Sequence, residues 1–128
     1  MKYLMLLNNS VEDARSWESL SEEGASELRS REVPRWEELF AWMGQTGIEL
    51  DGLELDGPSK VKTVRVRSEE ALVTDGPYVE TKEQIGGYFL VELDNLDQAI
   101  ELATRIPVVE KGSVEIRPVV ESEAEVPA

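Results

Sequence analysis

Residues 87–107 read GYFLVELDNLDQAIELATRIP, and this stretch decides the fold of the chain. It begins with an apolar run of strand length, which is typical of a buried strand. Over residues 96–103 the apolar side chains then recur at the spacing of one helical face. Asp94 or Asn95 can cap this helix, and Pro107 stops it. The stretch therefore predicts a strand that leads directly into a helix.

A strand and a helix are also predicted at the start of the chain. Residues 2–8, KYLMLLN, form a continuous apolar run that suits a central strand buried on both faces. Residues 9–20 are polar, and we expect them to be irregular. Ser21 begins a helix, and Pro34 predicts either two helical pieces or one kinked helix. Gly44 and Gly47 mark the end of this helical region.

Three further segments have the patterns of strands. Residues 48–55 (IELDGLEL) alternate apolar and acidic side chains, residues 61–74 predict a β-hairpin, and residues 112–119 (GSVEIRPV) alternate again. The alternation slips at Thr63, which leaves the face of this side chain open. The order β-α-β-(hairpin)-β-α-β predicts an α+β fold, the ferredoxin-like βαββαβ arrangement with an inserted hairpin.

In this fold both helices pack on one face of the sheet, and only side chains cover the other face. Apolar residues are expected on that second face as well: Leu4, Leu6, Val91, and either Phe89 or Tyr88. Such a face is too large an apolar patch for a soluble monomer. We therefore expect a homodimer that stacks sheet on sheet, with a pocket between sheet and helices or at the subunit seam.

Length and charge narrow the class of protein. The 128 residues predict a single domain over residues 1–120 and a disordered acidic tail at 121–128. A net charge of −14, from 27 acidic and 13 basic residues, opposes binding to nucleic acid and to anionic membranes. The absence of cysteine and histidine removes thiolate and imidazole chemistry. We predict no cofactor, no metal site and no membrane span, and a cytoplasmic location.

Residues 74–89, TDGPYVETKEQIGGYF, connect two predicted strands and permit two interpretations. In the structural interpretation, turn roles belong to Asp75, Gly76, Pro77, Gly86 and Gly87. Thr81 fits a capping box and begins one helical turn over residues 81–85. Residue chemistry alone favours this structural role.

The functional interpretation places the same loop around a cleft beside residues 60–67, the densest basic cluster of an acidic chain. The candidate catalytic residues are Asp75, Lys82 and Glu83, and the candidate ligand-binding residues are Arg65, Arg67, Tyr78 and Thr81. A carboxylate of raised pKa would act as general base, while Lys82 or an arginine would stabilise an enolate-like state. The arginines favour a carboxylate or another small anion as ligand.

Residues 74–92, TDGPYVETKEQIGGYFLVE, resemble the signature of the DGPF proteins, which belong to the wider YCII-related superfamily. The resemblance extends to MKYLMLL at the start, TVRVR before the loop, LDQAIELATRIP after it and GSVEIRPV near the end, so it covers most of residues 1–119. Tyr78 and Val79 stand where Phe and Ala are usual in the family, and Pro34 is unusual in the first helical region.

The resemblance implies a dimeric α+β barrel. Some family members are encoded beside extracytoplasmic-function sigma factors, which implies a regulatory link. Enzymatic relatives, including a dehydrochlorinase that acts on a chlorinated muconate-type acid, use a His–Asp pair that a chain without histidine cannot supply. We therefore expect a homodimer that binds a small ligand, and lean away from an enzyme. The alternatives are an enzyme of lyase or isomerase type that acts on a small organic acid through carboxylate acid–base chemistry, and an acidic module that binds a sigma factor or another basic protein.

Overall fold

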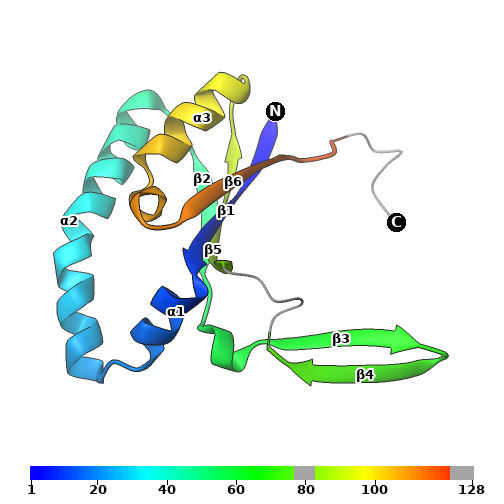
Figure 1. Ribbon diagram of the computed structural model, residues 1–128. Coiled ribbons are helices and arrows are strands. Elements are labelled where there is room, and N and C mark those ends of the chain that lie inside the picture. Colours follow the sequence, from blue (N-terminus) through cyan, green and yellow to red (C-terminus); the bar gives the residue numbers. More distant parts are fainter. Residues whose placement is uncertain (77–82, 122–128) are drawn as a thin grey trace.

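The computed structural model describes residues 1–76 and 83–121 (Figure 1). The helices are α1 (Val11–Glu18), α2 (Glu22–Thr46) and α3 (Leu96–Arg105), with two short 3-10 turns, η1 (Pro58–Lys60) and η2 (Pro107–Glu110). The strands are β1 (Lys2–Ser10), β2 (Leu50–Glu54), β3 (Lys62–Arg67), β4 (Glu70–Asp75), β5 (Glu83–Glu92) and β6 (Ser113–Pro118). None of these described helices is long and apolar enough to cross a membrane.

Four strands form one antiparallel sheet in the order β2-β5-β1-β6, and β3 and β4 form a separate two-stranded hairpin. β1 and β5 lie in the middle of the sheet, as their continuous apolar sequences require. Figure 1 shows α2 and α3 on one side of the sheet, while the hairpin projects on the other side. The predicted α+β class is confirmed, with an antiparallel four-stranded sheet and an inserted hairpin.

The core lies between the sheet and the helices α2 and α3. Alternate residues of β1, namely Tyr3, Met5 and Leu7, point toward the helices and are buried. They pack in one cluster with Phe89 and Val91 of β5, Leu39 and Met43 of α2, and Leu102 and Ile106 at α3. Removing this apolar surface from water is the main source of stability for such a fold.

One helix prediction needs correction, and a choice between two alternatives is decided. Residues 11–18 form α1 instead of irregular chain, because Ser10 caps the helix by accepting a hydrogen bond from the backbone N–H of Asp13 at 3.0 Å. α2 is one helix that runs through Pro34, not two pieces. The residues beside Pro34 are exposed, so water can bond the carbonyl of Ser30 that the proline leaves without its helical donor.

Two strand predictions also change. β5 begins at Glu83, so the helical turn predicted over residues 81–85 is wrong from Glu83 onward. β3 pairs with β4 without any slip, so Thr63 lies on the same face of the hairpin as Arg65.

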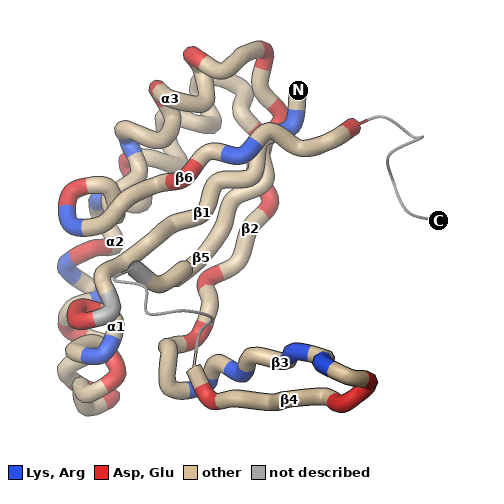
Figure 2. Tube along the Cα trace, turned by 45° about the vertical axis from the view of Figure 1, so that its right-hand side comes forward, with Lys and Arg blue, Asp and Glu red and all other residues tan. Residues whose placement is uncertain are grey.

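The face of the sheet opposite the helices is covered by no described helix, and we call it the open face. It carries Leu4 and Leu6 of β1, Tyr88 and Leu90 of β5, and Leu53 of β2. Val91 was predicted for this face but is buried under the helices, because it pairs with Tyr3 across the sheet. Figure 2 shows the hairpin extending from one end of the sheet on the side of the open face.

Candidate functional site

The end of β1 carries a polar run, Asn8-Asn9-Ser10, after its apolar residues. Asn8 is buried, and its Nδ2 donates a hydrogen bond to Oγ of Ser113 in β6 at 3.4 Å. Side chains alternate along a strand and Leu7 points toward the helices, so Asn8 and Ser113 lie on the open face. Hydrogen-bonding groups therefore stand at one end of an apolar surface.

A bulge in β5 lies beside this polar end. The pairing of β1 with β5 shifts at Asn8 and leaves Gly86 as the extra residue. A Cβ on Gly86 would overlap Nδ2 of Asn9, and a Cβ on Gly87 would come within 3.1 Å of the carbonyl oxygen of Leu53. The sharp bend predicted at Gly86 and Gly87 is therefore a bulged strand, in which close neighbours favour glycine.

Asp75 is the last residue of β4 and lies opposite Lys62, the first residue of β3, at the base of the hairpin. Its side chain is 85% exposed and forms an ion pair with Nζ of Lys62 in β3. Gly76 follows with a φ of +91°, a conformation that favours glycine. The Gly76 N–H donates to the carbonyl of Val61 at 2.8 Å, and the Gly76 carbonyl accepts from Oγ1 of Thr63 at 2.7 Å. Asp75 and Gly76 thus close the base of the hairpin.

The predicted ligand-binding arginines lie on the other side of this hairpin. Arg65 and Arg67 alternate with Lys62, the partner of Asp75, so they point to the opposite face. Nη1 of Arg67 donates to the carbonyl of Val66 at 2.9 Å. Pro77, Tyr78, Thr81 and Lys82 lie outside the described residues, as does the side chain of Glu83. The structure brings Asp75 to Lys62 and not to the arginines, and the full predicted set stays a prediction.

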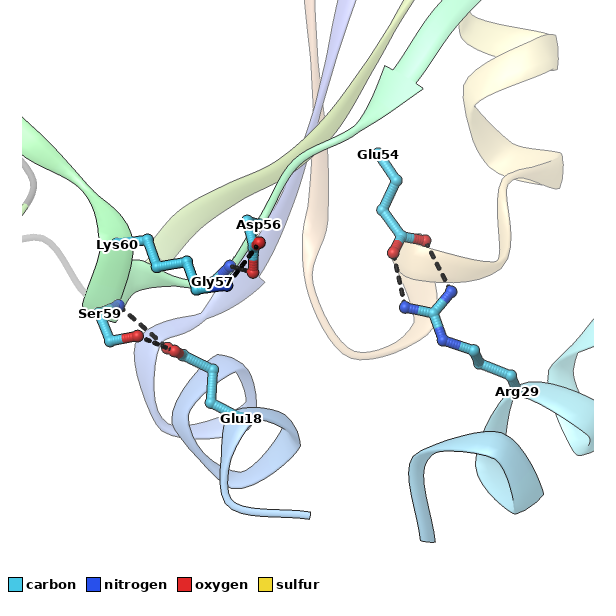
Figure 3. Close-up of polar contacts among 7 residues, drawn as sticks. All are labelled: Glu18, Arg29, Glu54, Asp56, Gly57, Ser59 and Lys60. Carbon is cyan, nitrogen blue, oxygen red and sulfur yellow. Dashed lines mark hydrogen bonds and ion pairs between the residues drawn. The ribbon is translucent and has the colours of Figure 1, made fainter. Parts of the chain in front are cut away.

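Two sets of contacts hold the base of the hairpin to the helices (Figure 3). The carboxylate of Glu18 in α1 accepts hydrogen bonds from the N–H of Ser59, at 3.1 Å, and from its Oγ. A Cβ on Gly57 would overlap the Glu18 side chain, so glycine allows this close approach. Arg29 of α2 donates two hydrogen bonds to Glu54 of β2, at 2.7 and 3.3 Å, and these bonds raise the pKa of Arg29.

Asp56 stabilises the turn that leads from β2 to η1. Its Oδ1 accepts a hydrogen bond from the N–H of Gly57 at 2.8 Å, and its Oδ2 pairs with Nζ of Lys60 at 3.0 Å. The backbone hydrogen bond from Gly57, and then the contact with Lys60, lower the pKa of Asp56 below its ordinary value. A lowered carboxyl pKa adds stability at neutral pH, and this contribution is lost as the pH falls through the lowered pKa.

A groove of about 190 Å³ lies between α2 and the C-terminal end of α3. It is lined by Arg35, Glu38, Leu39, Trp42, Arg105 and Pro107. The guanidinium of Arg105 lies 4.1 Å from the ring centre of Trp42 and pairs with Glu101 at 3.4 Å, while Arg35 pairs with Glu110. Because both arginines already face carboxylates, an anion entering this groove would have to displace them.

The polar end of the open face is suited to binding. It brings together a neutral amide from β1 and a hydroxyl from β6, those of Asn8 and Ser113. Such groups donate and accept hydrogen bonds but do not exchange protons at neutral pH, so they can orient a carbonyl, amide or carboxyl group. Within residues 1–76 and 83–121, no three carboxylates gather closely enough to hold a metal ion.

Sequence reasoning missed this polar end. Asn8 and Ser113 are 105 residues apart, and no short motif links them. The sequence did hold one signal, the two asparagines that follow the apolar run of the first strand. Buried polar side chains need hydrogen-bond partners, so these asparagines indicated a polar contact in the sheet.

Replacing Asp75 with Asn should leave the fold intact. We expect the free energy of unfolding in urea to change by less than about 1 kcal/mol, because exposed ion pairs contribute about 0–1 kcal/mol. The control Gly76→Ala should lose about 1–2 kcal/mol, since the left-handed conformation strains any residue with a Cβ. A large loss of stability in Asp75→Asn would contradict the exposed geometry of this side chain.

Comparison with known proteins gives the family. An uncharacterised protein of Rhizobium meliloti (strain 1021) is 40% identical over 58 residues, which are 44% of this chain and 47% of that protein. The match thus spans about half the length of that curated relative. The model of the YCII-related domain matches residues 1–123, which is nearly the whole chain. The chain therefore belongs to the YCII-related family.

Proposed function

We propose that the protein is a homodimer that binds a small polar ligand between the open faces of its two sheets. The single observation that supports this most is the open face itself. Leu53 is 64% exposed there, and the apolar residues beside it meet no described helix. Soluble proteins bury apolar surfaces of this kind by association. Two stacked sheets lie about 10 Å apart, and the dimeric α+β barrel implied by the family resemblance has this arrangement.

The ligand is a small molecule that carries a carboxyl or amide group. Asn8 and Ser113 stand at the end of the apolar open face, so a bound molecule would contact apolar side chains along its body and hydrogen-bonding groups at one end. Pockets for small ligands commonly combine an apolar lining with a few polar groups that orient the ligand. Neutral amides bind an uncharged or anionic oxygen without placing a fixed positive charge in the site.

Binding is better supported than acid–base catalysis. A general base with a raised pKa needs burial or a nearby like charge, whereas the Asp75 side chain is 85% exposed and faces the cation of Lys62. The enzymatic alternative therefore depends on Lys82 and Glu83, whose side chains lie outside the described part of the chain. The regulatory link to a sigma factor and the acidic interaction module stay proposals that co-purification at low and high salt would test.

Two measurements test the proposed function. Light scattering at micromolar concentration should give about twice the 14.4-kDa mass of the chain. A thermal-shift screen with acetate, succinate, benzoate and their amides should find at least one compound that raises Tm, because a ligand at about 100 times its Kd adds about 2.7 kcal/mol to stability. Ser113→Ala should reduce that shift, and the control Thr104→Ala, on the exposed side of α3, should keep it. A monomeric mass, or no shift with any compound, would contradict the proposal.

A further inference from the structure

The β3–β4 hairpin exposes an apolar face. Val64 and Val73 pair directly across it, Val66 follows on the same face, and all three side chains are 61–62% exposed. A two-stranded hairpin is only marginally stable in water unless another surface covers it. In Figures 1 and 2 the tip of this hairpin lies far from the rest of the described chain. The three valines therefore form a surface that the chain's own described residues leave uncovered.

The direction of the hairpin is held at its base. Glu18 of α1 binds Ser59 just before β3 and so ties the hairpin to the body of the molecule, while the pair of Asp75 with Lys62 joins β4 to β3 at the base. The N–H of Gly76 also bonds the carbonyl of Val61 at 2.8 Å. A segment that is already oriented loses less conformational freedom when it binds a partner. The hairpin is thus suited to act as an arm.

The reach and the charge of this arm fit a second copy of the chain. β3 and β4 have six residues each, so the arm spans roughly 20 Å at about 3.3 Å per residue. It extends on the side of the open face, where a second sheet would lie only about 10 Å away. β3 carries Lys62, Arg65 and Arg67, and Figure 2 shows basic positions along this strand. Three acidic residues of the hairpin, Glu69, Glu70 and Asp75, balance these charges, so the arm is formally neutral and approaches a second copy, with its net charge of −14, without net repulsion.

We propose that each subunit reaches across the dimer with this hairpin and packs the Val64, Val66 and Val73 face against the partner subunit. This inference rests on the proposed homodimer and adds to it a second contact, exchanged between the subunits, beside the stacked sheets. The arm of one subunit closes the side of the space between the sheets, so a ligand bound at the Asn8–Ser113 end is enclosed by both chains.

The double variant Val64→Thr with Val73→Thr tests the arm. Threonine keeps the β-branched shape and the strand preference of valine but replaces a methyl group with a hydroxyl. Losing two buried methyl groups, at about 0.8 kcal/mol each, should raise the dissociation constant of the dimer at least about tenfold. The control Leu72→Thr, on the opposite face of the same hairpin, should change it less than about twofold. Sedimentation over a dilution series measures the constants, and circular dichroism checks that each variant folds.

The outcomes separate the arm from the dimer. A dimer whose dissociation constant is unchanged in the double variant would overturn the arm and leave the stacked sheets standing. Equal weakening by Leu72→Thr would overturn the assignment of the valine face. A monomeric wild-type protein would remove the proposed function and the arm together. If the double variant does not fold, Val66→Thr alone is measured against Leu72→Thr, with an expected rise of the dissociation constant of about fourfold from one methyl group.

Discussion

Leu90→Glu should separate the proposed dimer into monomers. Leu90 lies on β5, one of the two central strands, and points to the open face between Leu4 on β1 and Asp51 on β2. In a stacked dimer a glutamate here would be taken out of water beside the carboxylate of Asp51, its cross-strand neighbour, which costs about 3–5 kcal/mol. The dissociation constant of the dimer should therefore rise about 10²–10³-fold. Sedimentation over a dilution series measures this change.

Ile100→Glu is the matched control for Leu90→Glu. It introduces the same charge, but Ile100 is an exposed residue of α3, on the helical side of the molecule. It should leave the dissociation constant within about threefold of the wild type, because only long-range repulsion between two acidic chains changes. Each variant should keep its far-UV circular dichroism spectrum. Equal dimer strength in Leu90→Glu and Ile100→Glu would show that the open face is not the interface.

The existence of the strands could be predicted from sequence, but their register could not. β1 and β5 are apolar on both faces, so their patterns do not say which residues turn toward the helices. The pairing of β5 with β1 determines which side chains point toward the helices. Tyr3 lies opposite Val91 and both are buried, while Tyr88 lies on the open face. Helix α1 was missed for a related reason. It is short and mostly polar, so its cap at Ser10 was the only strong sign of a helix.

The candidate site was harder to predict than the fold, because it depends on contacts distant in sequence. The charged residues at 74–89 predicted a cleft that places Asp75 beside Arg65. In the structure Asp75 pairs with Lys62 across the hairpin, while Arg65 points to the opposite face. Strict alternation along β3 would predict that Lys62 and Arg65 point to opposite faces of the hairpin. The sequence pattern, however, suggested a slip at Thr63, so this prediction could not be made. The contact between Asn8 and Ser113 joins the first strand to the last. Only the antiparallel pairing of β1 with β6 brings these two side chains together.

Gly112→Ala should destabilise the fold strongly. A Cβ at this position would overlap the carbonyl oxygen of Asn8 and lie within 3.3 Å of the Cα of Asn9. The obstacle is the backbone of a central strand that is paired on both sides, so it cannot move aside without breaking β-sheet hydrogen bonds. We expect a loss of about 1–3 kcal/mol or more in the free energy of unfolding. Urea denaturation and Tm measure it.

Gly44→Ala makes the same chemical change with the opposite expected sign. Gly44 lies in the last turns of α2, and a Cβ there meets nothing within 4 Å. Alanine should therefore raise the free energy of unfolding by about 0.5–1 kcal/mol, because it restricts the unfolded chain and favours the helix.

Gly112 also precedes Ser113, so Gly112→Ala should push β6 away from β1 and weaken the Asn8–Ser113 contact. In a Gly112→Ala chain that still folds, the thermal shift caused by a bound ligand should shrink, whereas Gly44→Ala should keep it in full. Loss of that shift in both variants would mean that the ligand does not bind at the Asn8–Ser113 end of the open face.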